Sequence, residues 1–130
     1  MKRWSLYLLF HPTSNRTYLG VTTDVFRRLR QHRCQISGGA RFTTRIQKTY
    51  PDTPWLLVCF LNGFESQSEV TRYERLLKLK TRGLKQRKKA VEDLSRRTHP
   101  QEFSRQMVDK YIIPDGLTIL YHDPLPESVA

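Results

Sequence analysis

The stretch TYLGVTTDVFRRLRQH, residues 17–32, decides the fold. Its first part, TYLGVT (17–22), alternates apolar and polar residues as a half-buried strand does. The rest predicts a basic helix over 25–33, with Thr23 or Asp24 in position to cap it. A strand that runs directly into a basic helix is therefore the unit on which the rest of the chain builds.

The residues before this stretch predict a partner strand. WSLYLLF (4–10) is an aromatic-rich apolar run, and HPTSNR (11–16) contains Pro, Ser and Asn, which favour a turn. Two such runs separated by a turn predict an antiparallel hairpin. Gly20 lies in the second strand, where the missing side chain lets another backbone or a substrate approach closely.

The middle of the chain predicts a buried strand and a long helix. WLLVCFL (55–61) is continuously apolar, which is typical of a strand covered on both faces, and NGF closes it. Ser66 and Glu69 have the spacing of a capping box, so a helix begins there. It is expected to run to about Arg82, with Gly83 as its stop.

The remaining segments carry weaker signals. Residues 37–54 are loop-like, with room for one short helix, and the final part contains PDGLTILYHDPLP, which predicts one short strand before a loose tail. The expected elements of the C-terminal part are two short helices, 86–97 and 100–110, and that strand within 114–126.

The composition is strongly basic. The 130 residues hold 23 Lys and Arg against 12 Asp and Glu, a net charge of +11. The charge is also uneven, because residues 1–50 hold ten bases and one acid whereas residues 98–130 hold two bases and five acids. A basic N-terminal half is the electrostatic signature of a polyanion-binding protein, although a soluble protein of high pI without such a ligand is the simpler alternative.

The two cysteines, Cys34 and Cys59, are too few for a disulfide framework or a four-thiolate zinc site. Cys59 lies in an apolar run and is expected in the core. The N-terminal apolar stretch is short and ends in His-Pro, unlike a signal-peptide cleavage site, so we expect a cytoplasmic or nuclear protein that is not secreted.

Two predicted helices carry polar residues on their apolar faces. On the long helix, Glu74 lies on the same stripe as Val70 and Leu77. On the first helix, His32 continues the apolar face, and Arg28 lies one turn before it. Each could be a solvated edge residue, with Glu74 paired to a neighbouring lysine or arginine. Together with nearby tyrosines, however, an arginine, a histidine and a carboxylate suit phosphodiester hydrolysis.

These residues resemble the GIY-YIG nuclease family. SLY, with Tyr7, stands where the first motif is expected, and YLG, with Tyr18 and Gly20, where the second is expected. Ten residues separate the two tyrosines, Arg28 lies ten residues after Tyr18, and His32 follows four later. The resemblance covers about residues 4–82. Within the family it is strongest to compact single-domain members and to the nuclease subunit of the eukaryotic complex that cuts branched DNA.

The resemblance implies a fold and a division of the chain. The expected fold is a small α/β domain with a three-stranded antiparallel sheet covered by helices. Residues 1–83 form the nuclease core, and residues 84–130 form a helical extension and tail packed on it. Two features depart from the family pattern: Ser5 replaces the first glycine, and two cysteines cannot build the zinc-binding RING-like domain of the eukaryotic subunit.

The resemblance also implies the chemistry. The catalytic residues are Tyr7, Tyr18, Arg28, His32 and Glu74, and Glu74 is the ligand of one Mg²⁺ or Mn²⁺ ion. Tyr7 is the preferred general base, with a phenol whose pKa neighbouring cations must lower from about 10. His32 accepts the proton, Arg28 stabilises charge on the scissile phosphate, and Tyr18 orients water or phosphate.

The implied substrate is DNA, in duplex or branched form, with selectivity for junctions and flaps and a role in repair or recombination. A non-catalytic nucleic-acid-binding domain and a ribonuclease are the alternatives. The acidic C-terminal region is a candidate surface for a protein partner or a second copy. Seven bases are expected to contact phosphates without reading sequence: Arg27, Arg30, Arg33, Arg41, Arg45, Lys48 and Lys78.

Overall fold

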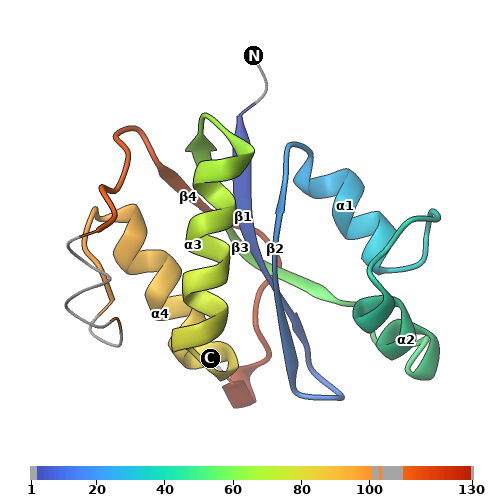
Figure 1. The fold of residues 1–130 in the computed structure, drawn as a ribbon. Coiled ribbons are helices and arrows are strands. Elements are labelled where there is room, and N and C mark those ends of the chain that lie inside the picture. Colours follow the sequence, from blue (N-terminus) through green and yellow to red (C-terminus); the bar gives the residue numbers. More distant parts are fainter. Residues whose placement is uncertain (1–2, 101–102, 104–109, 130) are drawn as a thin grey trace.

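The computed structural model describes residues 3–100, 103 and 110–129 and contains one four-stranded antiparallel sheet. Its order is β2-β1-β3-β4, so β2 and β4 form the edges (Figure 1). The strands are β1 (Trp4–His11), β2 (Arg16–Thr22), β3 (Leu56–Phe64) and β4 (Thr118–Tyr121). The helices are α1 (Val25–His32), α2 (Arg41–Thr49), α3 (Gln67–Lys80) and α4 (Gly83–Ser95), with a final 3₁₀ turn, η1 (Glu127–Val129).

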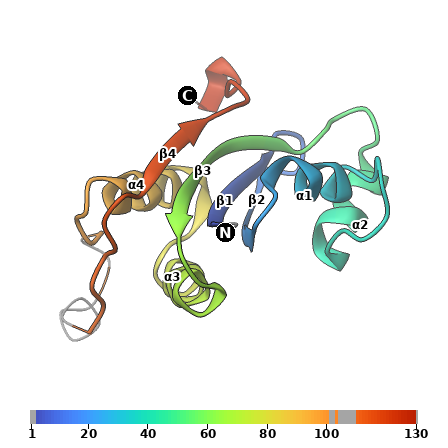
Figure 2. The ribbon, with the colours of Figure 1, turned by 90° about the horizontal axis from the view of Figure 1, so that it is seen from above.

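Two apolar clusters cover the two faces of the sheet. Successive residues of a strand point to opposite faces, and Leu6 and Leu8 of β1 accordingly pack with residues of α3 and α4. Tyr7 and Leu9 point the other way and pack with Leu29 of α1. The helices therefore divide into two pairs, with α3 and α4 on one side of the view and α1 and α2 on the other (Figures 1 and 2).

The predicted hairpin, caps and core cysteine are confirmed. β1 pairs with β2 in an antiparallel register that places Tyr7 opposite Gly20. Asp24 caps α1 by accepting the Arg27 N–H at 3.1 Å, and Ser66 caps α3 by accepting the Glu69 N–H at 3.2 Å. The side chain of Cys59 is fully buried in β3.

The expected number of strands, three, was wrong. β4 pairs with β3 and completes the sheet from a segment more than fifty residues away. The NGF segment also does not close the central strand, because β3 continues to Phe64. Buried residues of α4, including Val91 and Leu94, join the same core as α3. Residues from the proposed C-terminal extension thus contribute to the core of the described structure.

Helix boundaries were also corrected. α3 ends at Lys80, since Thr81 takes an extended conformation and its hydroxyl donates to the Leu77 carbonyl at 2.6 Å. Gly83, expected to stop that helix, instead begins α4 with a φ of 75°, in the left-handed region that glycine tolerates. The segment 37–54 contains the full helix α2. The expected helix over 100–110 lies mostly outside the described residues.

None of the helices in the described part of the chain has both the length and the hydrophobicity that a membrane-spanning segment needs.

Asp123 attaches the C-terminal segment to Arg33, the residue that follows α1, and to β3. One carboxylate oxygen accepts from the Arg33 guanidinium at 2.9 Å and from the Leu57 N–H at 2.8 Å. The side chains of both charged residues are about 20% exposed, at 19% for Arg33 and 20% for Asp123. A single carboxylate thereby satisfies two donors that belong to different parts of the sheet and its helices.

Replacing this carboxylate is predicted to destabilise the fold. Asp123→Ala leaves the Arg33 charge and the Leu57 N–H without their partner, so the free energy of unfolding should fall by about 1–3 kcal/mol. Denaturant unfolding measures it. The matched control is Asp115→Ala, whose carboxylate pairs with Arg97 while 84% exposed and should change stability by less than about 1 kcal/mol. Equal stability of the two variants would contradict this role of Asp123.

Candidate active site

The site begins with a close approach between two neighbouring strands. Tyr7 of β1 lies opposite Gly20 of β2, and its ring passes over that glycine. A Cβ at Gly20 would lie 2.3 Å from both Cζ and the hydroxyl oxygen of Tyr7, which is closer than any side chain can be. The glycine predicted to permit a close approach therefore makes room for the tyrosine ring itself.

The Tyr7 hydroxyl begins a buried chain of hydrogen bonds. It lies 2.7 Å from Nε2 of His32, and Nδ1 of His32 lies 2.5 Å from the Thr43 hydroxyl. The side chains of His32 and Thr43 are fully buried, and that of Tyr7 is 2% exposed. The chain joins β1, α1 and α2, and each of its polar atoms is satisfied by its neighbour.

The hydrogen bonds of Thr43 fix the tautomer of His32. The Thr43 hydroxyl donates to the Ala40 carbonyl at 3.1 Å, so its single proton is already used. It must therefore accept from Nδ1–H of His32. Nε2 is then unprotonated and accepts the proton of the Tyr7 hydroxyl.

Burial sets the protonation states of both residues. It raises the pKa of Tyr7 above its usual value, aided by the nearby Tyr18, against the opposing effect of the Arg28 guanidinium. Burial, and then Arg28, lower the pKa of His32 to about 4. The expectation that neighbouring cations lower the tyrosine pKa was wrong, because burial outweighs them. At neutral pH a neutral phenol donates to a neutral imidazole.

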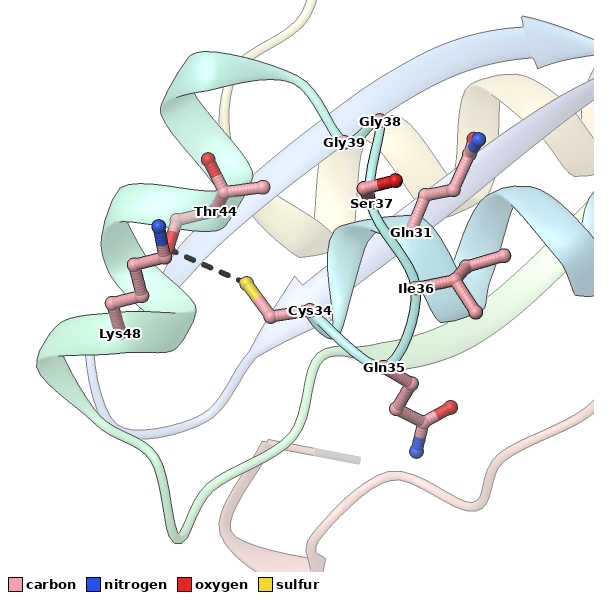
Figure 3. Close-up of a pocket in the computed structure, with 9 residues that line it drawn as sticks. All are labelled: Gln31, Cys34, Gln35, Ile36, Ser37, Gly38, Gly39, Thr44 and Lys48. Carbon is pink, nitrogen blue, oxygen red and sulfur yellow. Dashed lines mark hydrogen bonds between the residues drawn. The ribbon is translucent and has the colours of Figure 1, made fainter.

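Arg28 is held from outside the buried chain. One of its terminal nitrogens donates to Oε1 of Gln31 at 2.8 Å and to the Gly38 carbonyl at 2.6 Å. Gln31 and Gly38 line a pocket of about 490 Å³ beside the loop between α1 and α2 (Figure 3). The loop thus fixes one end of the guanidinium. The charge of this group acts to lower the pKa of both Tyr7 and His32.

Glu74 reaches the site from α3. Its carboxylate is near enough to Tyr7 to contribute to the raised pKa of the phenol, after the larger effects of burial and Tyr18. Oε1 lies 3.3 Å from Nζ of Lys78, and the Glu74 side chain is 16% exposed. The same Lys78 ammonium lies 5.5 Å from the centre of the Tyr18 ring. The alternative in which Glu74 pairs with a neighbouring lysine is therefore also realised.

The structure brings the five predicted catalytic residues together. The ring of Tyr18 lies 5.0 Å from that of His32 and 6.2 Å from that of Tyr7, measured between centroids. Arg28 and Glu74 act electrostatically on the same phenol. Within the described part of the chain, no three His, Cys, Asp or Glu side chains are grouped so that they could hold a metal. Glu74 is the one carboxylate among the five predicted catalytic residues.

The predicted phosphate-binding residues divide into two groups. Arg33 is engaged inside the protein, where Nε donates to the Trp55 carbonyl at 2.8 Å and Nη2 pairs with Asp123. This engagement argues against a phosphate contact for Arg33. The other six, which are exposed, are Arg27, Arg30, Arg41, Arg45, Lys48 and Lys78.

Sequence reasoning missed the contribution of α2. Thr43 orients His32, and Phe42 stacks on Tyr18 with ring centroids 6.3 Å apart. The available signal was a spacing of four residues, between Phe42 and Ile46 and again between Thr43 and Gln47. On a helix this spacing places the first pair in an apolar row and the second pair in a buried polar row. The helix has no side-chain cap, so its start carries no sequence signature.

Relatives in several eukaryotes are similar to part of this chain. A structure-specific endonuclease subunit SLX1 homolog of Giardia intestinalis is 37% identical over 67 residues, covering 52% of this chain and 17% of the relative. The corresponding subunit of Schizosaccharomyces japonicus is 39% identical over 61 residues, covering 47% and 20%. That of Schizosaccharomyces pombe is 36% identical over 76 residues, covering 54% and 26%. The similarity therefore spans about a fifth of the length of these relatives.

A family model extends over more of the chain. It matches residues 3–89, which run from the start of β1 into α4 and include all five residues of the site. The model describes the GIY-YIG catalytic domain. The expectation of this family is confirmed, and the chain belongs to the family of GIY-YIG catalytic domains.

Proposed function

We propose that this chain is a metal-dependent endonuclease that hydrolyses phosphodiester bonds of branched DNA in repair or recombination. The observation that carries the proposal is the Tyr7 hydroxyl, which donates to a neutral His32 while Arg28 and Glu74 act on it. A phenol with a proton acceptor on one side and a cation beside it is suited to activate water near a phosphate. The printed names of the relatives support the substrate.

The proposed proton path follows the buried chain. Water beside the phosphate gives its proton to the Tyr7 oxygen as the Tyr7 proton passes to Nε2 of His32. Because the phenol is not ionised beforehand, the two transfers occur together, and His32 becomes the imidazolium. Thr43 holds the ring in the tautomer that can accept. Arg28 stabilises the charge that develops on the phosphate, and Tyr18 orients water or phosphate.

Glu74 would hold the metal, Mg²⁺ or Mn²⁺. Hard divalent cations prefer oxygen ligands, and the carboxylate of Glu74 is partly exposed within the site. A single protein carboxylate would be enough for a hard cation of this kind, which needs few protein ligands. Such an ion supplies charge stabilisation for the leaving 3′ oxygen.

The six exposed predicted phosphate-binding residues would contact the DNA backbone. A protein partner would complete the enzyme. Five of them lie on α1 and α2, and Lys78 lies beside Tyr18. Backbone contacts of this kind favour structure over sequence as the basis of selection. The word "subunit" in the names of the relatives supports a protein partner. The C-terminal region is the candidate surface for that partner or for a second copy of the chain. A cytoplasmic or nuclear location agrees with such a substrate.

Replacing the proposed metal ligand should abolish cleavage without abolishing binding. Glu74→Gln keeps the size of the side chain but removes the negative charge that attracts the ion. Single-turnover cleavage of labelled four-way junctions, flaps, duplex DNA and RNA in Mg²⁺ measures activity, and fluorescence anisotropy measures binding. The control is Glu65→Gln, an equal charge change at an exposed residue outside the site. Cutting by Glu74→Gln at the wild-type rate would contradict the role of Glu74, and preferential cutting of RNA would contradict DNA as substrate.

Removing the Tyr7 hydroxyl should slow the chemical step. Tyr7→Phe keeps the buried ring but breaks the proton path, so the single-turnover rate should fall by about 10²–10⁴, which is typical of a general base. Substrate affinity should stay within about twofold, since the ring is kept and the proposed role of the hydroxyl is to take a proton from water. Tyr50→Phe, at a tyrosine that is 37% exposed, is the matched control. An unchanged rate for Tyr7→Phe would show that water is activated elsewhere.

A further inference from the structure

A basic pocket lies beside the proposed active site. It has a volume of about 280 Å³ and forms where the turn between β1 and β2, the start of α2 and the junction of α3 with α4 meet. In Figure 1 that turn lies at the bottom, between α2 and the end of α3. Three arginines line the pocket: Arg16 at the start of β2, Arg82 at the junction of α3 with α4, and Arg87 in α4.

The charge of this pocket is uncompensated in the described structure. No acidic residue is among the described residues that line it, and none of the three arginines forms an ion pair with the described part of the chain. Three guanidinium groups at one pocket repel one another. An anion bound among them would remove that repulsion and accept several charge-assisted hydrogen bonds.

Arg87 provides the most specific observation. Its Nη1 donates to the Thr17 hydroxyl at 3.0 Å, which fixes the guanidinium against β2. Its Nε is buried and has no hydrogen-bond partner within the described residues. Burial lowers the pKa of Arg87, so the charge is held at a desolvation cost. A cation that is fixed in place and partly desolvated in this way is stabilised by a bound anion.

The pocket is connected to the catalytic residues through aromatic rings. Phe42 lines the pocket and stacks on Tyr18, with an angle of 21° between the ring planes. Tyr18 in turn contacts His32 and lies under the Lys78 ammonium. A nucleic-acid strand that leaves the catalytic site along this path would meet Lys78 and then the three arginines.

We propose that this pocket is a phosphate subsite that binds one phosphate of the substrate strand beside the scissile phosphate. The proposal rests on the proposed nuclease function. The group is an internal diester of the strand or a terminal phosphate monoester, and both present anionic oxygens to the guanidinium groups.

The test couples changes in the protein to changes in the DNA. In the pocket variant, Arg16→Gln and Arg82→Gln remove two charges at exposed residues, so the fold should persist. The control, Arg96→Gln with Arg97→Gln, removes two charges near the other end of α4, about 20 Å away. Binding of a branched DNA is measured by anisotropy without Mg²⁺, while single phosphates are replaced in turn by neutral methylphosphonates. A parallel series removes the terminal phosphates.

The proposal predicts one sensitive phosphate. Neutralising that phosphate should weaken DNA binding by the wild type and by the control about tenfold. The same change should weaken DNA binding by the pocket variant less than about twofold. Sensitivity at an internal position identifies a diester, and sensitivity at a strand end identifies a terminal monoester. If the pocket variant responds like the wild type at every position, the subsite is refuted, whatever the cleavage activity. If the wild type does not bind DNA at all, the proposed function and the subsite are both refuted. If one phosphate is sensitive in the wild type but not in the pocket variant, and no DNA is cleaved, only the nuclease proposal is refuted.

Discussion

The hydrogen bond from the Tyr7 hydroxyl to Nε2 of His32 is the interaction on which the site depends. It joins a central strand to the helix that follows the hairpin, and Thr43 extends it to α2. All three polar groups are buried, where an unmatched donor or acceptor costs about 1–3 kcal/mol. The geometry is therefore fixed before any substrate binds. Gly20 is a condition of this arrangement, because any other residue there would displace the Tyr7 ring.

The sheet brings residues from both of its faces to one place. Tyr7 belongs to the apolar cluster shared with α1 and α2, whereas α3, which carries Glu74, packs with the other cluster. Because β2 is an edge strand, α3 can reach past it, and Lys78 lies against the ring of Tyr18. The residues of the proton path and the proposed metal ligand thus come from opposite faces of the sheet. Each set is positioned by the apolar cluster on its own face.

Local patterns predicted the elements that depend on local chemistry. The hairpin, α1 and α3 follow from alternation, turn residues and the caps Asp24 and Ser66. A short strand within 114–126 and a short helix within 37–54 were also expected, but their places in the tertiary structure were not. β4 is four residues long and is held by pairing with β3, and α2 lacks a cap and is held by Trp55, whose indole donates to the Thr43 carbonyl at 2.9 Å.

The same division applies to the site. Spacing and family resemblance predicted five catalytic candidates that the structure brings together, and each lies on an element with a strong local signal. Burial could not be predicted from spacing, so the direction of the Tyr7 pKa was wrong and the ion pair of Arg33 was missed. Contacts between different elements, such as the hydrogen bond between Thr43 and His32, could not be predicted either, because residue spacing does not show which elements pack together.

The state of His32 tests this account most directly. In protein labelled with ¹⁵N, nuclear magnetic resonance distinguishes a protonated ring nitrogen from an unprotonated one. The proposed proton path requires that Nδ1 carries the proton, that Nε2 carries none, and that the ring stays neutral until the pH falls to about 4. A proton on Nε2 at neutral pH, or titration at the ordinary histidine pKa of about 6.5, would contradict the proposed proton path.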